Sequence, residues 1–302
     1  MPILRHVLVA VLVLGSLYLL PGSARAETYN TCTGFIDSLP ATISAQGTWC
    51  LRGNLSTVIA SGSAITIATN NVTIDCNNFK IGGLGAGLGT RTEGISAGTK
   101  LNATIRNCNI RGFHIGINLD GIFGGNHLVE NNRVDSNTFV GIAVDGDGSM
   151  VRGNVVSDTG GTTLTGDTRA WGIVTSGTID IIDNTVSNVV AYQASGSATA
   201  TGIGAFVNAG GAIQRNRVRG LVPGPAAGGD EQGIASINTG SHPEISDNVI
   251  VGTGVDSATD FGVYCNGTGA AALASNNRIL RFGAGTAVSS NCIDAGNITD
   301  AP

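Results

Sequence analysis

The sequence predicts an all-β solenoid in which short parallel strands stack coil upon coil, and two repeated patterns predict it. The first pattern is an aliphatic residue, two variable residues, a polar residue that is usually Asn, one further residue and a second aliphatic. Self-similarity at a period of about 20 to 50 residues is the signature of a solenoid. The pattern occurs at Ile74–Phe79, Ile105–Ile110, Val129–Val134, Val151–Val156, Ile181–Val186, Ile213–Val218, Ile245–Ile250 and Ala274–Ile279.

The second pattern is a Gly followed by an aliphatic residue, upstream of each Asn motif except the first. Alternation along a strand sends one residue inward and the next outward, so identical positions can stack from coil to coil. We expect each Asn to occupy a left-handed corner and its amide to bond to the Asn of the next coil. The Gly pairs are Gly94-Ile95, Gly116-Ile117, Gly141-Ile142, Gly172-Ile173, Gly202-Ile203, Gly233-Ile234 and Gly262-Val263.

Composition supports many short strands and argues against a nucleic-acid partner. The chain contains 46 Gly, and only 12% of its residues are charged. A net charge of −5 without any basic run does not match the electrostatic footprint of a nucleic-acid-binding protein.

The first 26 residues are typical of a secretory signal peptide. Arg5 and His6 precede the apolar run from Val7 to Leu20, and Ala24-Arg25-Ala26 follows as a cleavage site. A retained membrane anchor is the alternative, but the run is shorter than the ~20 residues that a spanning helix needs. We therefore expect a secreted or periplasmic protein with no membrane span after cleavage.

Six cysteines follow the signal segment, and an even count in an exported chain favours disulfides. Sequence alone leaves the connectivity open, while proximity along the repeat favours Cys32 with Cys50, Cys76 with Cys108, and Cys265 with Cys292. A zinc site is the alternative, and it lacks closely spaced Cys or His pairs.

Uneven loop lengths predict a groove along the Gly-Ile strands. The loops that lead to Gly116 and Gly141 are short, and those on either side are long. We expect one wall from residues 80–93 and the other from residues 157–171, 187–201 and 219–232.

The floor of that groove carries the candidate site residues. If Ile117 and Leu119 point inward, Asn118 and Asp120 point outward, and Asp145 falls one coil above Asp120. Two adjacent carboxylates raise one pKa or recruit a cation, and oxygen ligands from Asp120, Asp145, Asp147 and Asn118 would suit Ca²⁺. The alternative is that these Asp-Gly sequences are ordinary turns.

From about Asn71 to Asn291, the Asn and Gly-Ile columns resemble those of the right-handed parallel β-helix proteins of pectate-lyase-like type. The resemblance implies a single-stranded right-handed solenoid of about eight coils over residues 71–302, preceded by a capping segment at residues 27–70. It does not settle activity, because such proteins include polysaccharide lyases, hydrolases, epimerases and non-catalytic surface proteins.

Resemblance to the lyases implies that acidic side chains hold Ca²⁺ against a uronate while an Arg or Lys removes a proton. Arg91 and Arg169, on opposite walls, are the catalytic candidates. Trp171 and Tyr192 could stack on sugar rings, with a core position as the alternative for Trp171. The Asn-Thr-Asp, Asp-Asp and Gly-His-Gly motifs of related hydrolases and the Asp-Pro-His-Asp motif of alginate epimerases are absent.

Two functions follow from these observations. The first is an exported monomer that binds, and could cleave, a polysaccharide, including a uronate-rich one. The alternative is a non-catalytic surface or adhesin-like scaffold. The histidines His114, His127 and His242 are interpreted as surface residues. The arginines Arg106, Arg133, Arg152, Arg217 and Arg278 beside the Asn column do not stack in unbroken succession, so they are interpreted as a solvated face, with a track for a polyanion as the alternative.

Overall fold

The computed structural model describes residues 31–121, 123–191, 198–206, 210–224, 229–238, 243–254, 259–267, 271–282 and 287–300. The chain divides into a short N-terminal unit, Met1–Thr31, and a unit formed by Cys32–Pro302. The predicted signal peptide, residues 1–26, lies outside the described residues. Among those described, no helix is long and apolar enough to cross a membrane.

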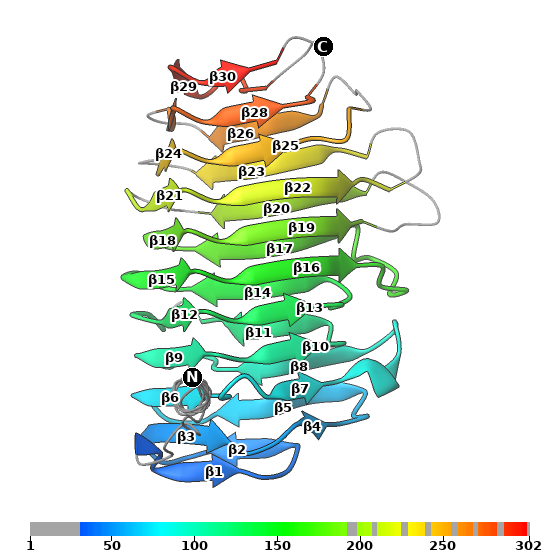
Figure 1. Cartoon of the computed structure of the whole chain (residues 1–302), viewed down its shortest axis with the longest axis vertical. Coiled ribbons are helices and arrows are strands. Elements are labelled where there is room, and N and C mark those ends of the chain that lie inside the picture. The colour runs from blue at the N-terminus through cyan, green and yellow to red at the C-terminus, as the bar shows by residue number, and fades with distance from the viewer. Residues whose placement is uncertain are drawn as a thin grey trace, which may run out of the picture. The chain divides into compact units, whose positions relative to one another are not determined.

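Three parallel sheets of 11, 10 and 9 strands form the Cys32–Pro302 unit, and each central coil contributes one strand to each sheet (Figure 1). Sheet A contains β1 Gly34–Ile36, β3 Gly47–Leu51, β6 Val72–Asp75, β9 Ala103–Arg106, β12 Leu128–Glu130, β15 Ser149–Arg152, β18 Ile179–Ile182, β21 Ala212–Gln214, β24 Glu244–Ser246, β27 Leu273–Ser275 and β29 Ile293–Ala295.

Sheet B contains β2 Ala41–Ile43, β5 Ser61–Ile67, β8 Arg91–Ser96, β11 Ile115–Leu119, β14 Val140–Asp145, β17 Arg169–Ser176, β20 Thr199–Phe206, β23 Glu231–Asn238 and β26 Phe261–Gly267. Sheet C contains β4 Leu55–Ser56, β7 Lys80–Gly82, β10 Asn109–Arg111, β13 Arg133–Asp135, β16 Val155–Gly160, β19 Thr185–Val190, β22 Arg217–Val222, β25 Val249–Val251, β28 Arg278–Leu280 and β30 Ile298–Thr299. A short 3-10 helix, η2, covers Leu84–Ala86.

The predicted all-β solenoid of stacked parallel strands is confirmed. Strands of residues 27–70 belong to the same sheets, because β3 pairs with β6, β4 with β7 and β5 with β8. The sheets are therefore continuous across residue 70. The right-handed sense of the coils remains a prediction, supported by the strong right-handed preference of parallel crossovers.

A continuous ladder of buried asparagines joins the coils at the corner between sheets A and C. In Asn184, Nδ2 donates to the Val151 carbonyl at 2.9 Å and to Asn216 Oδ1 at 3.0 Å. The backbone N–H of Asn184 also donates to Asn216 Oδ1, at 2.9 Å. One amide oxygen thus accepts two hydrogen bonds from the coil before it. The same arrangement runs through Asn132, Asn154, Asn184, Asn216, Asn248, Asn277 and Asn297.

The left-handed conformation belongs to the residue before each ladder position, so our expectation that the ladder Asn adopts it is wrong. The preceding residues have φ between 53° and 70°. The ladder Asn keeps ordinary φ, because its side chain must reach the inward carbonyl of the preceding coil. The left-handed residues are Asn107, Asn131, Gly153, Asp183, Arg215, Asp247, Asn276 and Gly296.

The Gly column exists because neighbouring coils leave no room for a side chain there. A Cβ on Gly116 would lie 2.6 Å from Val134 Cγ1 and 2.6 Å from the Gly141 carbonyl oxygen. Every Gly of the column meets the same two groups, the second aliphatic of an Asn motif and the carbonyl one coil on. Tight packing therefore explains the conservation of Gly along the repeat within this chain.

The first Asn motif, Ile74–Phe79, has a different register from the others. The sequence-based assignment of Asn77 to the ladder position and of Phe79 to the second aliphatic position was therefore wrong. The residue paired with the inward Ile110 is Ile81, which is fully buried, whereas Phe79 is only partly buried. Cys76, rather than Asn77, lies beside Cys108, with the two Cα atoms 4.7 Å apart. The corner of this coil contains extra residues, which moves both positions out of the common spacing.

All three disulfides that proximity favoured are confirmed. They join Cys32 to Cys50, Cys76 to Cys108, and Cys265 to Cys292. The Cα separation of 4.7 Å at the second bridge is the spacing of adjacent parallel strands. This bridge takes the place of an Asn ladder contact, and Cys108 N–H then donates to Asn132 Oδ1 to begin the ladder.

We predict that Asn184→Ala destabilises the solenoid by about 2 to 5 kcal/mol, because it leaves buried groups of two neighbouring coils without partners. The Val151 carbonyl and the Asn154 N–H both lose a hydrogen bond. Urea unfolding followed by circular dichroism measures the loss. Asn266→Ala, at an exposed position of β26, is the control. An equal, small effect of both changes would contradict a structural role for the ladder.

Candidate functional site

The outward face of sheet B carries the carboxylate pair expected from the sequence. Ile117 and Leu119 are fully buried, so the alternate positions of β11 face outward. The register pairs Asn118 with Ala143 and Leu119 with Val144, which brings Asp120 beside Asp145. Their side chains are hydrogen-bonded to each other, with Asp120 exposed and Asp145 half-buried.

This arrangement lets the pair hold a proton near neutral pH. Burial, followed by the hydrogen bond and the negative charge of Asp120, raises the pKa of Asp145 from an ordinary 3.8 to about 7, against an opposing bond from the Gly121 N–H. A carboxyl group with such a pKa can donate a hydrogen bond and also give up its proton at working pH.

Asp147 has a different environment from this pair. Its Oδ1 accepts the Thr178 N–H at 2.7 Å, so the side chain closes a turn onto the next coil. Within the described ranges, no group of three or more His, Cys, Asp or Glu side chains is placed to share a metal ion. The three Asp residues considered for Ca²⁺ are thus divided into a pair and a turn residue.

A second acidic residue extends the polar surface across the sheet. Glu93 Oε1 accepts a hydrogen bond from Asn118 Nδ2 at 2.6 Å, and Oε2 accepts one from Ser63 Oγ at 2.9 Å. Asn118 lies two residues before Asp120 on the same outward face. Carboxylate and amide groups therefore form a line that crosses three neighbouring coils.

The two long loops that were expected to form opposite walls meet each other. The Thr163 N–H donates to the Leu88 carbonyl at 3.3 Å, and Thr162 Oγ1 donates to the same oxygen at 3.4 Å. The loops that lead to Gly116 and Gly141 lie between these two long loops and are short, so the long loops can contact each other over them. At this edge the expectation of two separate walls is therefore wrong. Parts of the other wall, residues 192–197 and 225–228, lie outside the described residues.

His114 lies in the short loop beside this contact and is not a surface residue. Its side chain is only 12% exposed, stacks on Phe139, and approaches Asp167 with Nε2 3.6 Å from Oδ2. Burial lowers the pKa of His114, with Asp167 and Glu93 opposing and Arg91 reinforcing the shift. A short loop between two long ones was the sequence signal for this enclosure.

His127 also differs from the prediction. It is 2% exposed, and its Nδ1 accepts the Ala103 N–H at 3.2 Å, so it serves the packing of the coils. His242 lies outside the described residues.

The predicted catalytic arginines occupy the ends of sheet B strands near His114. Arg91 begins β8 and Arg169 begins β17, and both are exposed. The Arg169 guanidinium carbon lies 5.6 Å from the centroid of the Trp171 ring. Trp171 is 6% exposed, because its ring covers Gly204 and meets Phe206 edge-on. Tyr192 lies outside the described residues.

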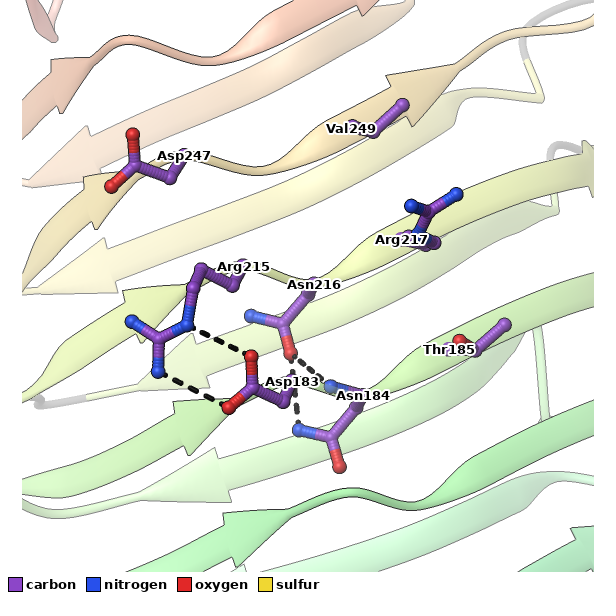
Figure 2. A pocket seen from close by; sticks show the side chains of 8 residues that line it. All are labelled: Asp183, Asn184, Thr185, Arg215, Asn216, Arg217, Asp247 and Val249. Carbon is purple, nitrogen blue, oxygen red and sulfur yellow. Dashed lines mark hydrogen bonds and ion pairs between the residues drawn. The ribbon is translucent and has the colours of Figure 1, made fainter.

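Sheet C carries two depressions that the sequence analysis did not find. The first, of about 370 Å³, is lined by Asp183, Arg215, Arg217, Asp247 and neighbours (Figure 2). The second, of about 510 Å³, is lined by Ser187, Asn188, Arg219, Gly220, Val251, Gly252, Thr253 and Arg281. Both depressions include residues of the same strand, β22.

One more carboxyl group is unusual for its burial. Glu231 is 1% exposed, and it accepts hydrogen bonds from the backbone N–H and Oγ1 of Thr253. Burial raises its pKa from an ordinary value of 4.5 to about 7, although the Thr253 bonds and Arg281 oppose the shift. Glu231 therefore binds its proton more tightly in the folded protein than in the unfolded chain.

Three continuous parallel sheets, joined coil by coil, decide the architecture. The chain is a parallel β-helix protein. No family model matches this β-helix protein, and no curated protein matches it.

One solved structure similar to it is the A-module of mannuronan C-5 epimerase AlgE6 from Azotobacter vinelandii, with 12% identity, a TM-score of 0.44, and coverage of 90% of this chain and 91% of that one. Another is the catalytic domain of a GH87 α-1,3-glucanase in complex with nigerose, with 12% identity and a TM-score of 0.36. The match covers 88% of the β-helix protein and 52% of the glucanase domain, about half of its length. At these TM-scores, function has to be argued from this chain's own residues.

We predict that Asp120→Asn lowers the pKa of Asp145 below about 7 but leaves it above the ordinary 3.8, since burial persists when the negative neighbour is removed. Titration of ¹³C-labelled Asp carboxyl groups by NMR measures the change. Asp158→Asn, at an exposed left-handed position that tolerates Asn, is the control. An unchanged Asp145 titration in Asp120→Asn would contradict the pairing.

A second prediction concerns Glu231. Because its folded pKa lies above its unfolded value, its contribution to stability is present below about pH 4.5 and is lost as pH rises to about 7. Glu231→Gln should remove this loss, on the order of 2 to 3 kcal/mol, and so stabilise the protein at pH 8 relative to wild type. Urea unfolding at pH 5 and pH 8 tests it, with exposed Glu244→Gln as the control. Identical pH profiles for wild type and Glu231→Gln would show that the buried carboxyl is not the cause.

Proposed function

We propose that this protein is an exported β-helix that binds a polysaccharide across the outward face of sheet B, at Asp120 and Asp145. The observation that carries the proposal is this hydrogen-bonded carboxyl pair, which holds a proton near neutral pH on an accessible face. The three disulfides support an oxidising, extracytoplasmic location for the protein.

The chemistry of the face suits the hydroxyl groups of sugars. Glu93, Asn118 and Asp120 offer acceptors and an amide donor along one line, and the carboxyl pair adds further acceptor oxygens. Because the solenoid repeats the strand spacing of ~4.8 Å, this line of groups is held rigidly by the coils beneath it. A polymer of sugar units can lie across several coils at once.

A uronate-rich polysaccharide would meet both signs of charge here. Arg91 and Arg169 could pair with its carboxylates, whereas Asp120 and Asp145 would repel them unless a cation intervened. Ca²⁺ prefers about six to eight oxygen ligands, and the carboxyl pair supplies only part of that number. The pair fits Ca²⁺ only if the polysaccharide and water complete the coordination, and the ion would then neutralise the facing carboxylates.

Cleavage of the bound chain is a narrower proposal within the same site. Glycoside hydrolases with two carboxyl groups keep them roughly 5 to 9.5 Å apart, which is farther than a hydrogen-bonded pair. The sequence also lacks the motifs of related hydrolases, so β-elimination is the reaction we propose if the protein is an enzyme. Arg91, Arg169 and His114 lie at the start of the sheet B strands, six or seven residues or roughly 20 Å along the strands from the level of Asp120 and Asp145, so none of them is placed to take a proton at the carboxyl pair. Trp171 is assigned a packing role because its ring is covered.

We predict that wild-type protein binds pectate, alginate or hyaluronan, and that Asp120→Asn and Asp145→Asn each weaken binding by about tenfold or more in the presence of Ca²⁺, as expected for a lost charged hydrogen bond. Isothermal titration calorimetry with and without Ca²⁺ measures it. Asp158→Asn, on the sheet C side of the solenoid, should bind as wild type does.

The same mixtures report on turnover through the absorbance of unsaturated uronates and through new reducing ends. Absorbance that appears with wild type and disappears in both Asp variants would identify a lyase. Binding without either product would identify a non-catalytic glycan-binding protein. No binding of any of the three polymers, or full binding by both Asp variants, would refute the proposed site.

A further inference from the structure

Strands β22 and β28 of sheet C present arginines with unpaired side chains, in contrast to the arginines of sheet A. On sheet A, Arg106 pairs with Asp75 at 2.8 Å and Arg152 pairs with Glu130 at 2.7 Å. On sheet C, Arg217, Arg219 and Arg278 are exposed, and within the described part of the chain none of their guanidinium groups has a hydrogen-bonding or ionic partner, although the backbone N–H groups of Arg217 and Arg278 are bonded. On an earlier coil of sheet C, Arg111 is neutralised by Asp135 at 3.2 Å. The arginines of β22 and β28 have no such acidic neighbour on the strands beside them.

The register groups these three side chains. Arg217 and Arg219 alternate outward on β22, so their Cα atoms lie about 6.6 Å apart. Arg217 pairs with Val249, which pairs with Arg278, so Arg278 is two strands or about 10 Å away along the solenoid. Strands β19, β22, β25 and β28 contain no acidic residue.

The acidic groups near this face are engaged elsewhere. Asp183 accepts both hydrogen bonds of Arg215, at 2.9 and 3.1 Å, and Asp247 also faces Arg215 from the next coil. Figure 2 shows Arg217 apart from this corner pair, on the neighbouring strand. Asp300 Oδ1 accepts the Arg281 N–H at 2.7 Å. The opposite charges at the corner therefore neutralise each other, whereas the positive charges on the outer face of the adjacent strands are not neutralised.

The surface between the arginines is apolar and hollowed. Val249 and Val251 are half-buried on β25, between Arg217 and Arg219 on one side and Arg278 on the other. Val249 lines the first depression and Val251 lines the second. An apolar floor flanked by guanidinium groups suits a ligand that has flat C–H faces and regularly spaced anionic groups.

We propose that the outer face of β19, β22, β25 and β28 is a second binding site that takes an anionic polysaccharide, with its carboxylate or sulfate groups on Arg217, Arg219 and Arg278. Guanidinium groups bind such planar oxyanions through two parallel hydrogen bonds. Ser187 and Asn188 lie beside Arg219 in the second depression and can bind sugar hydroxyls. The face is flat and narrow and the whole chain is acidic, which favours a single glycan strand over duplex DNA.

This site is independent of the carboxyl pair on sheet B. A polysaccharide on sheet C would tether the protein to an acidic matrix while the face of sheet B engages its own ligand. The two sites can therefore be removed separately by substitution.

The test is the binding of fluorescent dextran sulfate and polygalacturonate to Arg217→Gln/Arg219→Gln, with neutral dextran as the uncharged probe. We expect the double variant to bind dextran sulfate at least tenfold more weakly at low salt, and the slope of log affinity against log salt to fall by about one to two charges. Polygalacturonate binding should fall at least tenfold when the same two changes are made in the Asp120→Asn/Asp145→Asn background, where sheet B no longer contributes. Arg106→Gln/Arg152→Gln, which removes the same charge from sheet A, should change affinity by less than twofold. Asp120→Asn/Asp145→Asn should keep dextran sulfate binding.

Three results would overturn the proposal. One is an equal loss in both arginine double variants, which would reflect net charge alone. Another is unchanged binding in Arg217→Gln/Arg219→Gln. The third is binding of a short DNA duplex as tight as that of dextran sulfate. Thermal unfolding of each variant, at the same midpoint as wild type, separates a lost contact from a lost fold.

Discussion

Each ladder Asn accepts two hydrogen bonds at its side-chain oxygen, and the rest of the structure depends on this arrangement. In Asn216, Oδ1 receives both the backbone N–H and the side-chain Nδ2 of Asn184. Only one vertical alignment of two coils satisfies both donors, so the ladder fixes the register. A slip by one residue would exchange inward for outward side chains throughout the coil. The Gly column imposes the same register sterically from the opposite side of the core.

The fixed register creates the functional surfaces as well as the core. Asp120 and Asp145 come into contact because their strands are aligned by the residues on either side. Two ionised carboxylates repel each other at the strand spacing of ~4.8 Å. Burial and this repulsion raise the pKa of Asp145, so the pair keeps a proton near neutral pH. A partly buried carboxyl pair of this kind destabilises the folded state, and the hydrogen bonds and packing of the stacked coils offset that destabilisation.

The same repeat gives different electrostatics on different faces. Arg152 is neutralised because Glu130 occupies the matching position one coil earlier, while Arg217 lies between Thr185 and Val249. The charge of an outward residue is therefore decided by its neighbours on the adjacent coils and not by its own place in the repeat. This is why the arginines of sheet C form a surface of their own, with two depressions beside it.

The sequence by itself determined the solenoid, its inward columns and the Asp120 and Asp145 column, and it favoured the disulfide pairing that the structure shows. All of these follow from residues at a fixed spacing, because strands that pair in register turn periodicity directly into contacts. The tertiary structure alone decided the register of Phe79 and Ile81, the conformation of the residues before the ladder, the burial of His114 and His127, and the meeting of Leu88 with Thr163. Irregular corners and loops obey no period, so their positions depend on packing between distant segments that the spacing of residues does not encode.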